Sequence, residues 1–336
     1  MGDMRINKKG YPIAIGICIV AIILAFLFQN DYYLVIMLQI GSYYVASLGL
    51  NFITGLSGQP NMGVSGIFAL GAYTSALVSA KLGWSPFLAI IPVLIVGWII
   101  GKVLGFPTLR LDGVYLALTS MLFAEVIRIV IMNLTDFTGG AAGLKNIPHY
   151  RIFGIELSEY RYIVIMFALI SLLMSYLAYR IIRSRWGRAF IAVRDNVEAV
   201  GTCGINVASV KIIAFTVCCL FICVAGSMYA HYLTYLTPAA FTGLLSSSFV
   251  VILIIGGIGT VSGTFAGTIF VVLLPELLRF IGDYYMIVYI AIVLFSILFF
   301  PGGIIPTFGR MKSSFTSHDL IRSFFSTGRK GDRDNG

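Results

Sequence analysis

Long apolar segments alternate with short polar ones along most of the 336-residue chain. About 20 predominantly apolar residues are enough for a helix to cross the hydrocarbon core of a bilayer. Ten segments approach or exceed this length, at about 11–28, 33–54, 62–80, 86–105, 114–132, 161–180, 211–230, 240–256, 263–281 and 284–300. The pattern predicts an all-α polytopic membrane protein with about ten transmembrane helices within residues 11–305.

The polar stretches define the remaining parts of the chain. Residues 180–211 form the longest polar break in the second half, and we expect one helix outside the lipid there. Residues 133–160 form the longest loop on the opposite side, where the sequence TGGAAG (138–143) predicts an irregular cap rather than a domain. Residues 1–10 precede the first helix, and residues 306–336 form a polar, basic tail.

The positions of the charges predict the orientation. Only 11% of the residues are charged, compared with roughly a quarter in a soluble domain. If the N-terminus is cytoplasmic, 17 of the 23 Lys and Arg residues lie on the cytoplasmic side and four lie outside. This positive-inside bias predicts cytoplasmic termini and a cytoplasmic 180–211 loop in a multi-pass membrane protein. It also accounts for most of the net charge of +9 without a nucleic-acid partner.

Residues 55–62 (GLSGQPNM) interrupt two apolar segments with glycine, proline and amide residues. Such a break is either a short cytoplasmic turn or non-helical backbone at membrane depth, which must be surrounded by protein or water. The spacing leaves both alternatives open. Four polar residues in or near the break are candidates for lining a translocation path, on position alone: Asn51, Ser57, Gln59 and Asn61.

A short sequence occurs twice. Residues 64–69 (VSGIFA) match residues 261–266 (VSGTFA) at five of six positions, and both open an apolar segment. The match is either the trace of an internal duplication, which transporters often show, or a coincidence of common small residues.

Two apolar segments carry a glutamate three residues before an arginine, as Glu125 with Arg128 and Glu276 with Arg279. Residues at this spacing share a helix face, so each pair can neutralise itself. Charges at membrane depth normally face the interior of the bundle or a cavity. The pairs are therefore either structural or part of a substrate gate or docking point.

Glycine recurs at four-residue spacing in two apolar segments, which predicts close approach of neighbouring helices. The two sets are Gly97, Gly101, Gly105 and Gly259, Gly263, Gly267.

No pattern in the chain indicates a catalytic, nucleotide or metal site. The cysteines and the three histidines lack metal-ligand spacing, and no complete phosphate-binding loop is present. No series of acids crosses the apolar segments, which argues against a proton-driven carrier, although sodium sites built from carbonyl groups would leave no trace. We therefore expect no enzyme and no bound cofactor, and energy for uphill transport would come from an ion gradient or another chain.

The 180–211 loop carries a second pattern besides its positive charge. Ala189, Val193, Val197 and Val200 fall at helical spacing, and the polar face opposite would be formed by Arg188, Arg194, Asp195 and Glu198. Glu198-Ala199-Val200, followed after three residues by Gly204, matches the spacing of the E-A-A-x-x-x-G signature of ABC importer permeases. The I-x-L-P ending of that signature is absent.

Longer blocks of the sequence resemble one family. These blocks are LGLNFITGLSGQPNMGVSGIFALGAYT (48–74), PTLRLDGVYLAL (107–118), TGGAAGLKNIP (138–148) and GRAFIAVRDNVEAVGTCGIN (187–206). Together with Glu125 and Arg128, they are similar to the LivM-type permease subunit of branched-chain amino acid ABC importers. The resemblance covers residues 33–305, but not the first helix or the basic tail.

The resemblance implies a membrane complex in which this chain binds no cofactor and partner subunits use ATP. The implied partners are a second related permease, two cytoplasmic ATP-binding subunits and a periplasmic or lipid-anchored substrate-binding protein, in addition to membrane lipid. The 180–211 loop would form the coupling helix on an ATPase, through Arg188, Arg194, Asp195, Glu198, Ala199 and Gly204. The implied substrates are branched-chain or other neutral amino acids.

Several alternatives remain open from the sequence. Related ABC permeases carry urea, short amides or sugars. A self-sufficient secondary transporter would need no ATPase, and a membrane scaffold or sensor would move no solute.

Overall fold

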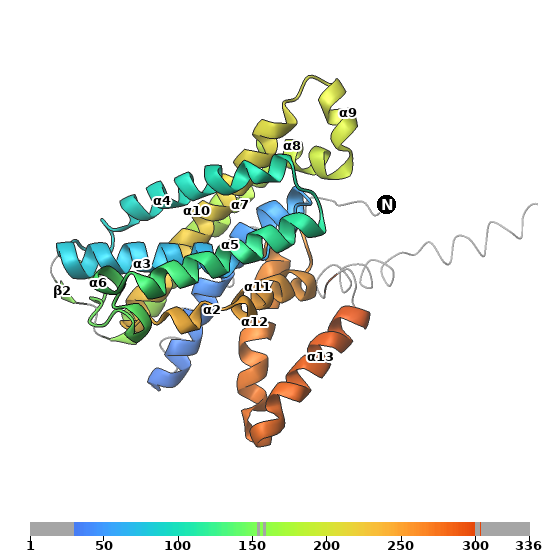
Figure 1. The fold of residues 1–336 in the computed structure, drawn as a ribbon. Helices are drawn as coiled ribbons and strands as arrows, with labels where there is room; N and C mark the ends of the chain where they lie inside the picture. Colours follow the sequence, from blue (N-terminus) through green and yellow to red (C-terminus); the bar gives the residue numbers. More distant parts are fainter. Residues whose placement is uncertain (1–29, 153–154, 157–158, 300–302, 304–336) are drawn as a thin grey trace, which may run out of the picture.

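The computed structural model describes residues 30–152, 155–156, 159–299 and 303. These residues form a helical bundle in which α10 lies centrally (Figure 1). The longer helices are α2 (Asp31–Leu50), α3 (Val64–Leu82), α4 (Ile90–Gly105), α5 (Val114–Asn133), α7 (Tyr160–Arg183), α10 (Val207–Leu233), α11 (Gly243–Gly256), α12 (Val261–Leu278) and α13 (Tyr285–Phe299). The shorter elements are a π-helical turn (Asn51–Leu56), α6 (Thr135–Thr138), β1 (Arg151–Ile152), β2 (Ile155–Glu156), α8 (Arg185–Asp195), α9 (Val197–Thr202) and 3-10 turns at Pro107–Leu109, Gly140–Ala142, Pro238–Ala240 and Arg279–Tyr284.

The helical class predicted from the apolar pattern is confirmed. Nine of the ten predicted segments correspond to helices, while segment 11–28 lies outside the described residues. The only strands among the described residues form the two-residue antiparallel hairpin β1–β2. Six helical stretches of the described chain are long and apolar enough to cross a membrane, and α4 and α13 contribute shorter apolar helices. The full count of about ten spans stays a prediction.

The core forms where α10 packs against α2, α3 and α4. The first glycine set makes part of this contact, because a Cβ atom at Gly101 would lie 2.5 Å from Cα of Thr216 in α10. Gly97 and Gly105 face α10 in the same way, against Cys219 and Ile212. The predicted close approach of helices is therefore confirmed for this set.

The second glycine set joins α11 to α12, but only two of its members lie on a helix. Gly263 and Gly267 both approach the backbone of Gly256 in α11. Gly259 has φ of +85° and precedes α12, so its expected place on the helical stripe is wrong. A positive φ is incompatible with a right-handed helix, and α12 begins two residues later, at Val261.

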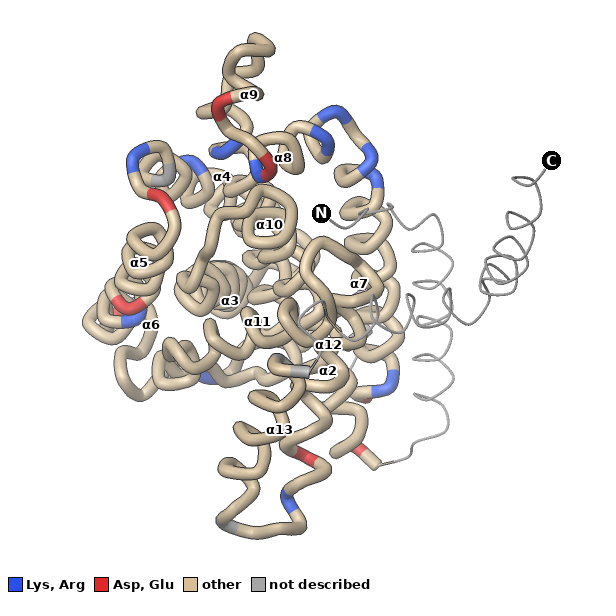
Figure 2. The backbone as a smooth tube through the Cα atoms, turned by 90° about the vertical axis from the view of Figure 1, so that its right-hand side faces the viewer, with Lys and Arg blue, Asp and Glu red and all other residues tan. Residues whose placement is uncertain are grey.

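The two polar regions lie at opposite ends of the bundle. Helices α8 and α9 project from one end, and α6 with the β1–β2 hairpin lies at the other (Figure 1). Lys and Arg residues gather at the end that carries α8 and α9 (Figure 2). This arrangement agrees with the opposite sides assigned to residues 180–211 and 133–160, although it does not by itself identify the cytoplasmic side.

The 133–160 loop is tied to the bundle by hydrogen bonds. Leu144 and Leu236 pair through both backbone groups, at 2.9 and 3.0 Å. Buried His231 in α10 lies with Nδ1 2.8 Å from the carbonyl oxygen of Pro148 and Nε2 2.8 Å from Oγ of Ser75. A carbonyl can only accept, so Nδ1 carries the proton and Nε2 accepts from the serine hydroxyl. The loop is thus held against the end of the bundle, and its assignment as an irregular outer cap stays a prediction.

Candidate coupling site and transport pathway

The polar loop folds as two short helices rather than the single helix that we expected. Oγ of Ser184 accepts hydrogen bonds from the backbone N–H groups of Trp186 and Gly187 and so caps α8. Asn196 lies between the helices in an extended conformation, and its Oδ1 accepts from N–H of Ala199 at 3.0 Å. Asparagine is among the preferred N-cap residues, which explains why the helix stops and restarts here.

The break at Asn196 also changes the predicted apolar stripe. Val193 and Val200 are buried against the bundle, and Ala189 packs against the same core. Val197 is 45% exposed, so its predicted place on the buried face is wrong. It is the first residue of α9, where the restarted helix no longer continues the spacing of α8.

The residues of the sequence signature lie at the exposed tip formed by α9. Glu198 and Ala199 are exposed, as are Arg188 and Asp195 in α8. Gly204 has φ of +77°, and no atom lies within 4 Å of the place its Cβ would occupy. The glycine is therefore required by the backbone conformation that follows α9, rather than by a close neighbour.

Arg194 differs from the other members of the predicted polar face because it contacts the bundle. Its Nη1 donates a hydrogen bond to the carbonyl oxygen of Gly55, at 2.6 Å. Its side-chain stem lies over Gly58, where a Cβ would come within 2.9 Å of Cγ of the arginine. Gly58 has φ of +71°, which also favours glycine. Helix α8 thus touches the 55–62 break directly.

The 55–62 break is a buried connection between α2 and α3. Ser57, Gln59 and Asn61 are at most 5% exposed. Nε2 of Gln59 donates to Oγ of Ser57 at 2.6 Å, and Oδ1 of Asn61 accepts from N–H of Gly63 at 2.7 Å. Oε1 of Gln59 and Nδ2 of Asn61 have no hydrogen-bond partner among the described residues. Protein encloses these three polar side chains, although Gly58 and Met62 of the same break are exposed.

Asn51 holds the other end of the π-helical turn. Its Oδ1 accepts from N–H of Gly259 at 2.8 Å, and its Nδ2 donates to Oγ1 of Thr264 at 3.2 Å and to the carbonyl oxygen of Thr260 at 3.3 Å. These residues belong to the second copy of the repeated hexapeptide and the loop before it. Both copies begin a helix after a non-helical connection, α3 in one case and α12 in the other. Their equivalent positions support the duplication alternative.

The Glu125–Arg128 pair lies on an exposed, otherwise apolar face of α5. Nε of Arg128 lies 3.0 Å from both carboxylate oxygens of Glu125. The side chain of Glu125 is 45% exposed. The large apolar side chains exposed on the same helix include Leu118, Leu122, Val126 and Ile129. An exposed ion pair among them is unfavourable against lipid, so this face calls for a protein neighbour or water.

The Glu276–Arg279 pair closes on itself in the same way, at 3.5 Å. Nη1 of Arg279 also donates to the hydroxyl of Tyr32 at 3.1 Å. Pro275 lies inside α12 just before the pair, and the chain turns sharply after it at Gly282. This pair lies at a helix end, and Arg279 is largely exposed. The hydrogen bond from Arg279 to Tyr32 links the end of α12 to the start of α2.

The described chain is a helical bundle with several segments that can span a membrane. Helix α8, which leads to the exposed tip, touches the break between α2 and α3. These features define a multi-pass membrane protein built like a transporter subunit. Residues 32–297 match the family described as "Branched-chain amino acid transport system / permease component", and the chain belongs to this family. It is 32% identical over 288 residues to the high-affinity branched-chain amino acid transport system permease proteins LivM of Salmonella typhimurium and Escherichia coli. These alignments cover 79% of this chain and 68% of each relative.

A third relative is more distant. The probable branched-chain amino acid transport permease protein LivM of Methanocaldococcus jannaschii is 26% identical over 323 residues, covering 81% of this chain and 92% of the relative. No solved structure matches the chain. The resemblance drawn from the sequence blocks is confirmed by the family match.

Proposed function

We propose that this chain is the permease subunit of an ATP-driven importer for branched-chain or other neutral amino acids. Its family and the names of its relatives support this proposal. The chain would act with a second related permease, two cytoplasmic ATP-binding subunits and a periplasmic or lipid-anchored substrate-binding protein. It would lie in the inner membrane with about ten spans and both termini in the cytoplasm.

The contact between α8 and the 55–62 break is the observation that carries the proposed coupling mechanism. The exposed tip of α8 and α9 would dock on an ATPase through Arg188, Asp195, Glu198 and Ala199. Movement of the tip would reach the break through the hydrogen bond from Arg194 to Gly55. Since the break lies between α2 and α3, a change in its backbone alters the relation of these two helices.

The unsatisfied atoms of the break suggest where a substrate would be held. Oε1 of Gln59 can accept a hydrogen bond from an ammonium group, and Nδ2 of Asn61 can donate to a carboxylate. A buried polar atom without a partner costs about 1–3 kcal/mol. A zwitterion that reached these atoms would recover part of this cost, without a protein charge that would trap it.

The exposed face of α5 is the proposed contact with the second permease. Glu125 and Arg128 would then lie between two subunits or beside the water of the pathway, rather than against lipid. This position would allow the pair to act as a gate whose ion pair opens as the two subunits separate.

The coupling proposal is tested by variants at the tip of the loop. Glu198→Gln and Gly204→Val, co-expressed with the partner subunits, are expected to reduce uptake of labelled leucine while membrane insertion stays normal. Cys203→Ser is the matched control, because Cys203 is exposed and lies in the same loop. Normal uptake by both variants would refute the coupling role.

The same preparation distinguishes the proposal from a self-sufficient carrier. Vesicles containing this chain alone are expected neither to hydrolyse ATP nor to transport leucine. Transport by the chain alone would instead identify a secondary transporter.

A further inference from the structure

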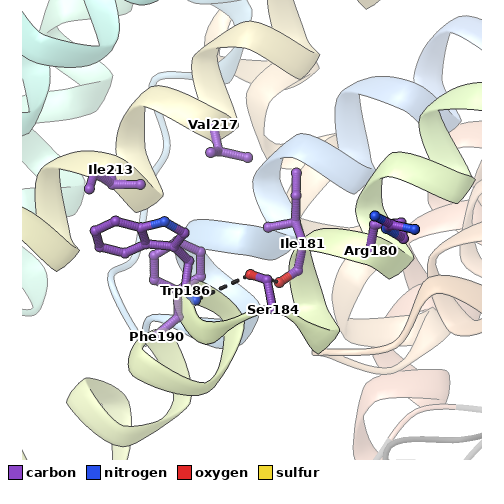
Figure 3. A pocket seen from close by; sticks show the side chains of 7 residues that line it. All are labelled: Arg180, Ile181, Ser184, Trp186, Phe190, Ile213 and Val217. Carbon is purple, nitrogen blue, oxygen red and sulfur yellow. Dashed lines mark hydrogen bonds between the residues drawn. The ribbon is translucent and has the colours of Figure 1, made fainter.

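A cavity of about 270 Å³ opens where the end of α7, the start of α8 and the side of α10 meet. Its lining is almost entirely apolar, and it includes the side chains of Ile181, Trp186, Phe190, Ile213 and Val217 (Figure 3). A water molecule takes up about 30 Å³ in the liquid, and a methylene group is of similar size. The cavity therefore has room for a segment of hydrocarbon chain, but not for a whole lipid.

One arginine lines this cavity, and a second lies beside one of the lining residues. Arg180 lines the cavity on the side away from Trp186 and Ile213 (Figure 3). The guanidinium of Arg185 lies 5.6 Å from the ring centre of Trp186. In the described part of the chain, no carboxylate pairs with either arginine. A positive charge without a carboxylate partner among the described residues thus lines the apolar opening, and a second lies next to Trp186.

The surroundings place the cavity at the edge of the membrane. Helix α7 is a candidate membrane span, and its last turn contains Arg180 and Arg183. Helix α8 follows at once, with Trp186 near its start. Trp and Arg are typical of the zone where lipid head groups meet the hydrocarbon core. The polar rim of the cavity would lie at the level of the head groups, and its apolar interior at the level of the hydrocarbon core.

We propose that the cavity binds an anionic phospholipid, with part of one acyl chain against Trp186 and Val217 and the phosphate against Arg180 and Arg185. Apolar walls exclude a hydrophilic ligand, and the uncompensated arginines select a negative head group over a neutral one. The site would keep a lipid beside the joint between α7 and α8, where the polar loop leaves the bundle. The lipid is not a transported substrate, because the site is separate from the 55–62 break.

Tryptophan fluorescence offers a direct test. Trp84→Phe and Trp98→Phe leave Trp186 as the only tryptophan, and neither replaced residue lines the cavity. The full chain is reconstituted in phosphatidylcholine vesicles with increasing fractions of brominated phosphatidylglycerol or of brominated phosphatidylcholine. Because one arginine near an anionic head group contributes about a fivefold preference, quenching by the anionic lipid should reach half its maximum at about fivefold lower mole fraction or less.

Two variants and one control separate the head-group and acyl-chain contacts. Arg180→Gln should lower the preference for phosphatidylglycerol about fivefold, and Arg110→Gln, which changes an exposed arginine outside the cavity, should leave it unchanged. Val217→Phe should fill the cavity and reduce quenching by both lipids, while gel filtration confirms folding. Equal quenching by both lipids in the parent would show bulk lipid only. Absence of quenching by either lipid would show that protein covers the cavity. Either result overturns the proposal.

Discussion

Replacement of Arg194 provides the sharpest test of how the polar loop acts on the bundle. The Arg194→Gln variant loses the charged hydrogen bond from Nη1 to the carbonyl oxygen of Gly55. Helix α8 should nevertheless remain docked, because Phe190 and Val193 are buried beneath it. The variant therefore weakens the link to the break without removing the helix.

The size of the effect can be worked from the contact. A hydrogen bond to a charged group is worth about 1.5–3 kcal/mol, and the exposed setting of Arg194 places this one at the lower end, about 1–2 kcal/mol. One or two kcal/mol change an equilibrium by about 5- to 30-fold. If this bond transmits the movement of α8, leucine uptake should fall by about this factor, and Arg194→Lys should restore part of it.

The assay compares uptake and ATP hydrolysis in the same reconstituted complex. Arg194→Gln should lower the number of leucine molecules moved per ATP, because the ATPases still dock on α9. Arg110→Gln is the control, since Arg110 is an exposed arginine that lies outside α8 and α9. Unchanged uptake per ATP in Arg194→Gln, with the control also normal, would refute transmission through Gly55.

Two further predictions concern the packing of the bundle. Gly101→Ala should lower the melting temperature of the purified chain, because the new Cβ meets the α10 backbone at Thr216, whereas Gly201→Ala should change it little, since no atom lies within 4 Å. His231→Ala should make the 133–160 loop more sensitive to protease, because the carbonyl of Pro148 loses its donor, at about 1–3 kcal/mol, while Ser75 keeps its bond to Ser227. An unchanged digestion rate would show that the loop is held without the imidazole.

The helices of this protein could be predicted from sequence because their lengths depend on local composition. A segment that must match the thickness of a bilayer shows its ends as a change from apolar to polar residues. The glycine set of α4 was equally readable, since spacing alone places its members on one helix face. The π-helical turn at Asn51–Leu56 could not be predicted from the sequence, because its apolar residues continue the pattern of α2 without interruption.

The candidate site was predictable only in part. The exposed tip and the terminating glycine followed from the spacing of Glu198 and Gly204. The break between α8 and α9 has a local signal in Asn196, a preferred N-cap residue, although the apolar spacing across it favours one helix. The contact between Arg194 and Gly55 has no signal in the sequence. The two residues are 139 positions apart, and an arginine or a glycine is not unusual in its own segment.

These contacts indicate which part of the bundle can move. Asn51 fixes the start of the π-helical turn to the loop before α12, and Arg194 binds the Gly55 carbonyl near the end of the turn. The two unsatisfied atoms, in Gln59 and Asn61, follow directly after this turn. Unpaired buried polar groups raise the free energy of this segment. A rearrangement that pairs them therefore lowers the free energy more than the same rearrangement of a fully paired helix would. The break, rather than any of the long helices, is therefore where a displacement of α8 should first change the structure.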